Sequence, residues 1–230
     1  MLIQADTGKA ATRKYKFEIR DLRLFVKTLN LHDGLALDIA RKLDLQPARY
    51  GLRRTMLKSL LISKGDTEFN ANLYIEEVPR RLVLAFVSNE AFIGNKHKSP
   101  FNFEHFNVRE VNVYCNGRVY PATPYNLDYT TNNYVRAYHD MQENMGTAWS
   151  VESNGIDYAM FKTGWCIYVF SLTNSMENEP GFELIREGTT SITIRFKQAL
   201  GSNVTLIAYA ELDSLLMIDK YRTVTSDISI

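Results

Sequence analysis

Apolar and polar residues alternate along most of this chain with a period of two, which is the pattern of strands that bury one face. The clearest example lies near the C-terminus, where Ile192, Ile194 and Phe196 alternate with polar residues and a second alternating run follows over residues 204–212. Turn-forming residues at 199–203 separate the two runs. The pattern therefore predicts a β-hairpin made of these two strands.

Other strands are predicted at intervals upstream. Residues 52–63, 75–87 and 165–172 are rich in apolar, β-branched or aromatic residues. Within 75–87 both alternating sets are apolar, so we expect that strand to be covered on both faces. Asn116-Gly117, which stands between two short apolar runs, is the strongest hairpin signal in the chain because both residues tolerate the positive φ of a type I′ turn.

The N-terminal region divides into two parts. Residues 1–14 are small and polar and predict an arm or linker. Residues 15–27 alternate like a half-buried strand, with a bulge between Ile19 and Leu22. We therefore expect an arm over residues 1–14 and a single domain over residues 15–230.

Two helices are predicted, both in connections between strands. Asp33 is placed to cap the first, whose apolar residues recur at helical spacing, and Pro47 ends it. Residues 134–145 contain enough helix formers for a short surface helix, and residues 174–188 are expected to form a loop. The fold class is therefore all-β: a jelly-roll β-sandwich of about eight antiparallel strands, with short helices in the connecting loops.

Composition and charge narrow the choice of function. The 230 residues, 45% of them hydrophobic, are enough for a packed core in one domain. Lys and Arg number 27 against 26 Asp and Glu, which gives no broad positive field for nucleic acid or an anionic membrane. No apolar run approaches the roughly 20 residues of a membrane span, and no signal-peptide pattern opens the chain. We expect a soluble product that is not secreted.

Candidate catalytic and metal-binding residues are sparse. Cys115 and Cys166 stand inside strand-like runs without CxxC spacing, so we expect reduced thiols in the core. The four histidines form no ligand pair on a single element, and the neighbouring Glu76 and Glu77 would face opposite sides of a strand. The sequence has no GxSxG, P-loop or GxGxxG motif. We therefore expect no enzyme activity, no metal or cofactor and no small-molecule substrate.

The chain has two basic pairs. Arg53 and Arg54 lie at the start of the predicted strand at 52–63, and Arg80 and Arg81 lie within the one at 75–87. We expect them to be solvated strand ends or salt-bridge donors at an interface, because arginine suits bidentate pairing with carboxylates. A contact with the phosphates of packaged DNA is the weaker hypothesis.

Aromatic residues cluster in the connection at 100–106. If these side chains are exposed they form an interaction site, and if they are tucked under the sheet they form a satellite core. The sequence leaves both possibilities open. Tyr134, Tyr138 and Trp149 raise the same question on a second loop.

Several short motifs combine into a family resemblance over roughly residues 70–225. The first three are Pro79-Arg80-Arg81, Asn89-Glu90-Ala91-Phe92 and Lys98-Ser-Pro-Phe-Asn-Phe-Glu-His105. The others are Tyr134-Val-Arg-Ala-Tyr138, Gly164-Trp-Cys-Ile-Tyr-Val-Phe-Ser-Leu-Thr173 and Ile218-Asp-Lys-Tyr-Arg222. In combination they resemble the C-terminal part of the major capsid protein of Polinton (Maverick) elements and related adintoviruses.

That resemblance implies a structural capsid domain. Members of the family are double jelly rolls whose trimers form the pseudo-hexagonal capsomers of an icosahedral shell, whereas this chain holds one jelly roll and a short arm. It implies a place in the virion, with further copies of the chain and neighbouring capsid proteins as partners. The candidate interface and motif residues are Pro79, Arg80, Arg81, Pro100, Phe101, Asn102, Phe103, His105, Tyr134, Arg136, Tyr138 and Asp219.

Two other hypotheses belong to different classes of protein. One is a single jelly-roll recognition module, domesticated from a capsid gene, that binds a glycan or a peptide through the aromatic loops around Phe101 and Tyr134. The other is an enzyme on a cupin-like barrel, which would need a bound metal.

Overall fold

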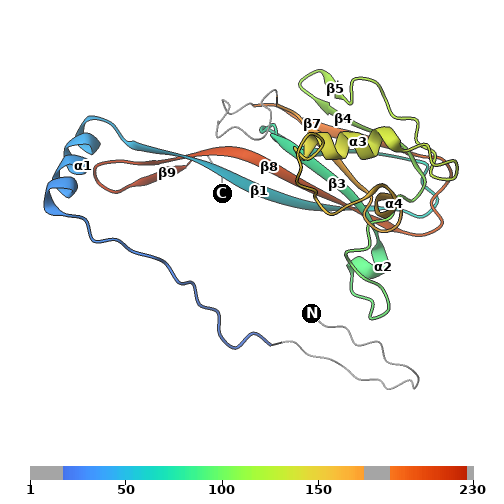
Figure 1. Cartoon of the computed structure of the whole chain (residues 1–230), viewed down its shortest axis with the longest axis horizontal. Helices are drawn as coiled ribbons and strands as arrows, with labels where there is room; N and C mark the ends of the chain where they lie inside the picture. The colour runs from blue at the N-terminus through green and yellow to red at the C-terminus, as the bar shows by residue number, and fades with distance from the viewer. Residues whose placement is uncertain (1–17, 174–186, 227–230) are drawn as a thin grey trace. The chain divides into compact units, whose positions relative to one another are not determined.

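The computed structural model describes residues 18–173 and 187–226 (Figure 1). These residues form two compact units. Unit 1 holds residues 18–48 and 218–223, and unit 2 holds residues 49–173, 187–217 and 224–226. The expected boundary between an arm and a domain, at residue 14, lies outside the described residues, so that division stays a prediction.

The strand expected over residues 15–27 is not formed in the described part of that segment, so this prediction was wrong. Residues 18–32 have no regular secondary structure, and their large apolar side chains are exposed: Ile19, Leu22, Leu24, Phe25, Val26, Leu29 and Leu31. Alternation gives a segment the side-chain pattern of a strand, but its backbone groups still need a neighbouring strand. Among the described strands, none pairs with this segment.

The first predicted helix is confirmed as α1, Asp33–Leu45. Its cap differs by one residue: His32 is the N-cap, and its Nδ1 accepts a hydrogen bond from the Gly34 amide at 3.3 Å. Asp33 lies in the first turn, where its negative charge faces the positive end of the helix dipole. The helix ends two residues before Pro47, because the residue that precedes a proline avoids the helical conformation.

Unit 2 is a jelly-roll β-sandwich of two antiparallel sheets, which confirms the expected fold class. One sheet has the order β1-β8-β3-β6, with β9 also paired to β8, and the other has the order β2-β7-β4-β5. The strands are β1 Ala48–Ile62, β2 Glu68–Tyr74, β3 Arg81–Ser88, β4 Val108–Cys115, β5 Arg118–Tyr120, β6 Ile167–Ser171, β7 Thr190–Phe196, β8 Val204–Ile218 and β9 Val224–Ser226. Three helices lie in its connections: α2 Asn89–Phe92, α3 Val135–Asn144 and α4 Tyr158–Lys162.

β3 is the doubly covered strand that the sequence predicts. It pairs antiparallel with β8 on one side and with β6 on the other, so Leu84 has Ala208 and Tyr168 as its cross-strand neighbours. Leu84 and Phe86 are fully buried inside the sandwich, and Val87, on the opposite face of the strand, is fully buried as well. A strand covered on both faces has no position for a polar alternation, which explains its continuous apolar run.

The hairpin predicted from the two C-terminal runs is wrong. β7 lies between β2 and β4 in the four-stranded sheet, whereas β8 lies between β1 and β3 in the other sheet (Figure 1). Residues 197–203 therefore cross between the sheets, and Leu200 packs into the core at that crossing. Alternation shows which face of each strand is buried, but two strands satisfy it equally well from opposite sheets as side by side.

The Asn116-Gly117 hairpin is confirmed between β4 and β5. The two residues have φ values of 48° and 76°, as a type I′ turn requires, and Cys115 pairs with Arg118 across the turn. β2 was not predicted, because Asn and Glu occupy its outward positions and Ala one of its inward positions, which leaves a weak strand signal.

The second predicted helix is confirmed as α3, which packs against β6 and buries Ala137 and Met141. Cys115 and Cys166 are both buried, as expected for thiols of the core. Most of the loop expected at 174–188 lies outside the described residues.

Candidate interaction surfaces

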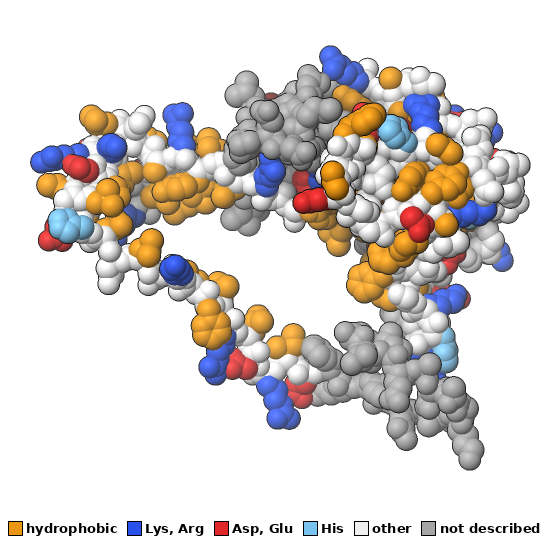
Figure 2. All heavy atoms as spheres, viewed as in Figure 1, with side chains coloured by type: hydrophobic (Ala, Val, Ile, Leu, Met, Phe, Trp, Pro, Cys, Tyr) orange, Lys and Arg blue, Asp and Glu red, His pale blue; other side chains and the backbone are white. Residues whose placement is uncertain are grey.

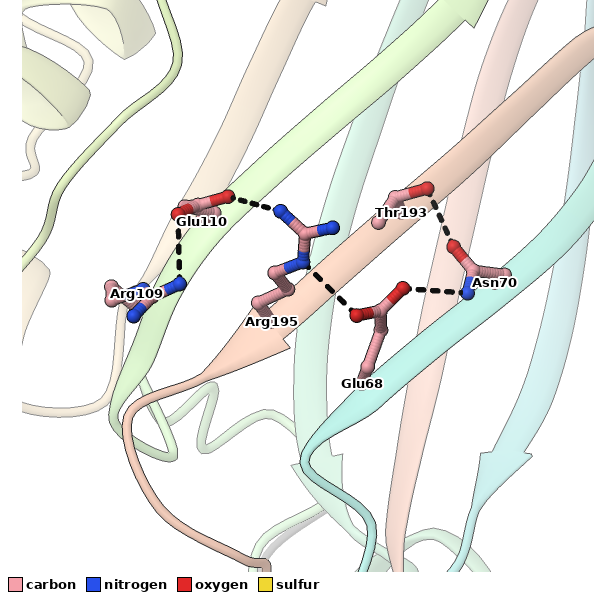
Figure 3. Close-up of polar contacts among 6 residues, drawn as sticks. All are labelled: Glu68, Asn70, Arg109, Glu110, Thr193 and Arg195. Carbon is pink, nitrogen blue, oxygen red and sulfur yellow. Dashed lines mark hydrogen bonds and ion pairs between the residues drawn. The ribbon is translucent and has the colours of Figure 1, made fainter.

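The outer face of the four-stranded sheet is covered by a ladder of polar side chains. Figure 3 shows its members, which come from β2, β4 and β7: Glu68, Asn70, Arg109, Glu110, Thr193 and Arg195. Arg195 lies at the centre, with Nε 3.0 Å from Glu68 and Nη1 3.1 Å from Glu110. Both carboxylates raise the pKa of Arg195, the Glu68 hydrogen bond most of all. Because these groups satisfy one another across three strands, this face is suited to water.

The other sheet ends in an apolar edge. β1 is the last strand in its order, and four large side chains along it are exposed: Tyr50 by 51%, Leu52 by 42%, Leu57 by 69% and Leu61 by 56%. We call these four residues the β1 edge patch. Figure 2 shows hydrophobic side chains gathered along the part of β1 and β8 nearest β9. An exposed, apolar edge strand tends to pair with another chain unless it is covered.

Arg80 and Arg81 are not the solvated strand ends that the sequence suggested. Arg80 is 3% exposed, with Nη1 3.8 Å from an oxygen of Asp213, and Nη1 of Arg81 lies 3.4 Å from Glu211. Pro79, which precedes them, is buried too. Burial lowers the pKa of Arg81. Of the two expected alternatives, solvation is wrong for this pair, because both arginines lie beside β8, whose outward side chains supply the facing carboxylates. A role as salt-bridge donors at an interface stays a prediction.

The connection at 100–106 combines both alternatives that the sequence left open. Phe101 is 70% exposed, whereas Phe103 and Phe106 are half-buried. The Phe103 amide donates to the Gly164 carbonyl at 2.9 Å, and the Cys166 amide donates to the Phe103 carbonyl at 3.0 Å. Backbone pairing thus holds the middle of this connection against the turn before β6, and leaves its first aromatic ring, with Pro100, at the surface.

A column of stacked rings extends the core beside β6. The ring of His105 stacks on Tyr129 at 4.1 Å, Tyr129 on Tyr134 at 5.2 Å, and Tyr134 on Tyr158 at 4.3 Å. Tyr134 is 3% exposed and donates to the Tyr158 carbonyl, and desolvation raises the pKa of Tyr134 to about 12. Stacked aromatic pairs contribute beyond the area that they bury. The second loop therefore supplies core residues, and the binding surface suggested around Tyr134 is not supported.

The other motif residues of this region also have structural contacts. Tyr138 packs edge-on against Tyr158 and donates to the Ile156 carbonyl at 3.1 Å. Arg136 is exposed, but its Nη2 donates to the Thr123 carbonyl at 2.7 Å and its guanidinium lies over Tyr125. Arg136 thus fastens α3 to the loop that precedes it, and Tyr138 fastens α3 to the segment that leads into α4.

Two residues of the sequence analysis lie outside this cluster. Trp149 is 84% exposed in the loop after α3. Asp219, in unit 1, shapes a turn, because its Oδ1 accepts hydrogen bonds from the amides of Tyr221 and Thr223 at 2.9 and 2.8 Å. An Asp that bonds its own downstream backbone is a turn residue.

His105 gives the fold a dependence on pH. Desolvation lowers the pKa of His105 below its usual value of 6.5, and the nearby Lys162 lowers it further. The unfolded chain therefore binds a proton at a higher pH than the folded chain does, so stability is lost as pH falls below about 6.5. We expect His105→Asn to reduce this loss of stability. Its side-chain oxygen keeps an acceptor near the position of Nδ1, which accepts a hydrogen bond from the Asn107 amide. Urea unfolding between about pH 7.5 and pH 5.5 measures the loss.

His97→Asn is the matched control, because His97 is exposed on the surface. Its pH dependence should equal that of the unmodified chain. If the free energy of unfolding fell equally with pH in the His105 variant and in the unmodified chain, His105 would not be the cause of the loss.

Among residues 18–173 and 187–226, no three His, Cys, Asp or Glu side chains are grouped so that they could hold a metal ion. In the same residues, no helix has the length and hydropathy needed to cross a membrane.

Comparison with known sequences gives a relative in Caenorhabditis elegans. No family model matches this chain. The chain is 33% identical over 216 residues to uncharacterized protein F54H12.2 of Caenorhabditis elegans. The match covers 91% of the chain and 51% of that protein, so the chain spans about half the length of the curated relative it matches.

Comparison with solved structures gives viral proteins. The chain superposes on a chain of the Sputnik virophage with a TM-score of 0.47 and 13% identity, over 80% of this chain and 40% of that chain. For the mavirus major capsid protein the TM-score is 0.40 at 9% identity, over 80% of this chain and 42% of that chain. For PBCV-1 VP54, fitted into a reconstruction of Sputnik, the TM-score is 0.47 at 12% identity, over 87% of this chain and 55% of that chain.

Sequence reasoning missed the β1 edge patch, although a signal was present. Leu57 and Leu61 alternate with Met56 and Leu60, so both faces of β1 carry large apolar residues. In β3 the same pattern of apolar residues on both faces predicts burial of both faces. In β1 that cover is not supplied by the described residues, and the outward leucines are exposed.

Proposed function

We propose that this chain is a jelly-roll domain of a viral or virus-like transposon major capsid protein. It acts by associating with itself into trimeric, pseudo-hexagonal capsomers of an icosahedral shell, and its place is the virion. The motif resemblance over roughly residues 70–225 supports the family, and the two-sheet sandwich supports the fold that the family requires.

The observation that carries the proposal is the β1 edge patch. Four large apolar side chains are exposed along β1, which among the described strands is the last of its sheet, whereas the ladder around Arg195 makes the outer face of the opposite sheet hydrophilic. A subunit that packs side by side with other subunits in a shell needs this contrast: its apolar edges contact neighbouring subunits, and its polar faces contact solvent. The association proposed here therefore uses the edge at β1.

The motif residues support a structural protein in a second way. Arg80 and Tyr134 are buried, and Phe103 is held by backbone pairing, so these residues maintain the fold. Their contacts hold the start of β3 and the connections before β6 in place.

Sedimentation of the chain tests the proposal. We expect a species of three times the mass of the chain, which dissociates in the double variant Leu57→Lys with Leu61→Lys. Each leucine contributes about 1.5–3 kcal/mol when it is fully buried. The double variant is therefore expected to weaken association by a factor on the order of 100 or more, since every 1.4 kcal/mol is tenfold.

The double variant Trp149→Lys with Val151→Lys is the matched control, because both side chains are exposed in the loop after α3 and their replacement adds the same two charges to the surface. This variant should associate like the unmodified chain. Two results would sink the proposal: a monomer at every concentration reached, or an oligomer that the double variant leaves intact.

A further inference from the structure

A cavity of about 520 Å³ lies at one end of the sandwich, where four connections meet. Its walls come from the end of β3 and α2, from the connection at 93–107, from the turn between α4 and β6, and from the β7–β8 crossing at Ser202. Figure 1 shows α2 and α4 at this end. The volume falls within the range of about 300–1,000 Å³ that is usual for small-ligand pockets.

The walls of this cavity are held in place before any ligand binds. The backbone pairing of Phe103 with Gly164 joins the two longest walls. Asn102 packs so closely on Gly164 that a Cβ added there would lie 2.6 Å from its Oδ1, and Gly164 has φ +104°. The Asn102 amide is fixed in turn by donating to Glu104 at 2.7 Å. A glycine is therefore required at this position, and the pocket is preorganised.

The lining combines exposed aromatic rings with planar polar groups. Phe101 is 70% exposed and Trp165 is 42% exposed, although both line a cavity. The same lining includes His97, Asn102 and Glu104, which offer an imidazole, an amide and a carboxylate. An aromatic ring presents its flat face to C–H groups, and amides and carboxylates take paired hydroxyl groups. The ligand that matches both at once is a pyranose sugar, which has an apolar face and a rim of hydroxyl groups.

The charges of the lining favour a neutral ligand. Lys98 is engaged by Glu90, with 2.6 Å between Nζ and Oε2, and the Glu104 carboxylate accepts the Asn102 amide. No cluster of cations remains among the lining residues to attract a phosphate or a carboxylate. An extended peptide usually binds by adding to an open sheet edge, whereas this cavity is walled by connections at the ends of strands.

We infer that this cavity is a binding site for a neutral carbohydrate, with Phe101 and Trp165 as stacking platforms and Asn102, Glu104 and His97 as hydrogen-bonding groups. The site is separate from the β1 edge patch, so it stands whether or not the chain forms trimers. In a shell it would add recognition of a glycan-coated surface to the structural role.

Tryptophan fluorescence tests this inference directly, because the chain has two tryptophans and Trp149 lies outside the pocket. In a Trp149→Phe background, Trp165 reports alone. We would titrate that protein with three neutral trisaccharides: cellotriose, mannotriose and N-acetylchitotriose. Sialyllactose serves as an anionic probe, and an uncharged Tyr-Pro-Tyr peptide serves as a peptide probe. The expected result is a saturable change with at least one neutral trisaccharide.

Phe101→Ala should weaken that binding at least tenfold without unfolding the chain, because this ring is mostly exposed. Phe92→Ala removes a similarly placed ring of α2 outside the cavity lining and should leave binding unchanged. Three results overturn the inference: no saturable change with any neutral sugar, preference for sialyllactose or the peptide, or equal affinity in the Phe101→Ala variant.

Discussion

Replacing Phe86 by Ala is expected to lower the free energy of unfolding by about 3–5 kcal/mol, which is the usual cost of emptying a large aromatic site in a core. Phe86 is fully buried in β3, with Tyr168 and Phe196 packed edge-on at 6.0 and 6.2 Å. It joins the two sheets, because Tyr168 belongs to one and Phe196 to the other. A loss of this size is a large part of the roughly 5–15 kcal/mol that holds a typical domain together.

Urea unfolding followed by circular dichroism measures this effect. Phe86→Leu should recover much of the stability, because it restores apolar volume without the aromatic pairs. Phe92→Ala, on the exposed end of α2, should change stability by no more than about 0.5 kcal/mol. A cost for Phe86→Ala as small as that of the Phe92 control would mean that the ring does not join the sheets as described.

The second large effect is expected from Asp213→Ala, which removes the carboxylate that faces the buried Arg80. Removing one member of a buried ion pair typically costs about 3–5 kcal/mol, because the remaining charge has lost its compensation. Asp213 lies on β8 with its side chain 9% exposed, and Arg80 directly precedes β3. We therefore expect the midpoint of urea unfolding to fall sharply in this variant.

Two comparisons separate the buried charge from a general effect of the mutation. The double variant Arg80→Met with Asp213→Leu removes both charges, and it should recover most of the lost stability. Glu211→Ala removes the partner of Arg81 on the same two strands, where both side chains are less completely buried, and should cost less than Asp213→Ala. Equal losses for Asp213→Ala and Glu211→Ala would show that burial does not decide the cost.

The elements of this fold that depend on residues close to one another in the sequence could be predicted from the sequence. The Asn116-Gly117 turn is confirmed because its conformation requires positive φ at two adjacent residues. α1 is confirmed because a polar N-terminus, a helical apolar stripe and Pro47 all lie within one short segment. β3 is confirmed because both of its alternating sets are apolar.

Features that depend on distant residues were predicted less well. The segment at 18–27 has the pattern of a strand but no partner among the described strands. Arg80 looks like a surface residue in the sequence, and its burial depends on Asp213, which lies on β8. In the same way, Phe101 and Trp165 are distant in the sequence, and only the pairing of Phe103 with Gly164 brings their segments to one cavity.

The sequence by itself determined the all-β class, the short-range turns and the buried face of most strands, because these follow from side-chain periodicity and local backbone preferences. Only the tertiary structure decided that β7 and β8 lie in opposite sheets, that Tyr134 belongs to the core, and that the leucines of β1 remain exposed. The physical reason is that periodicity records whether a side chain is buried, whereas the choice of the element that buries it is made by contacts between distant segments.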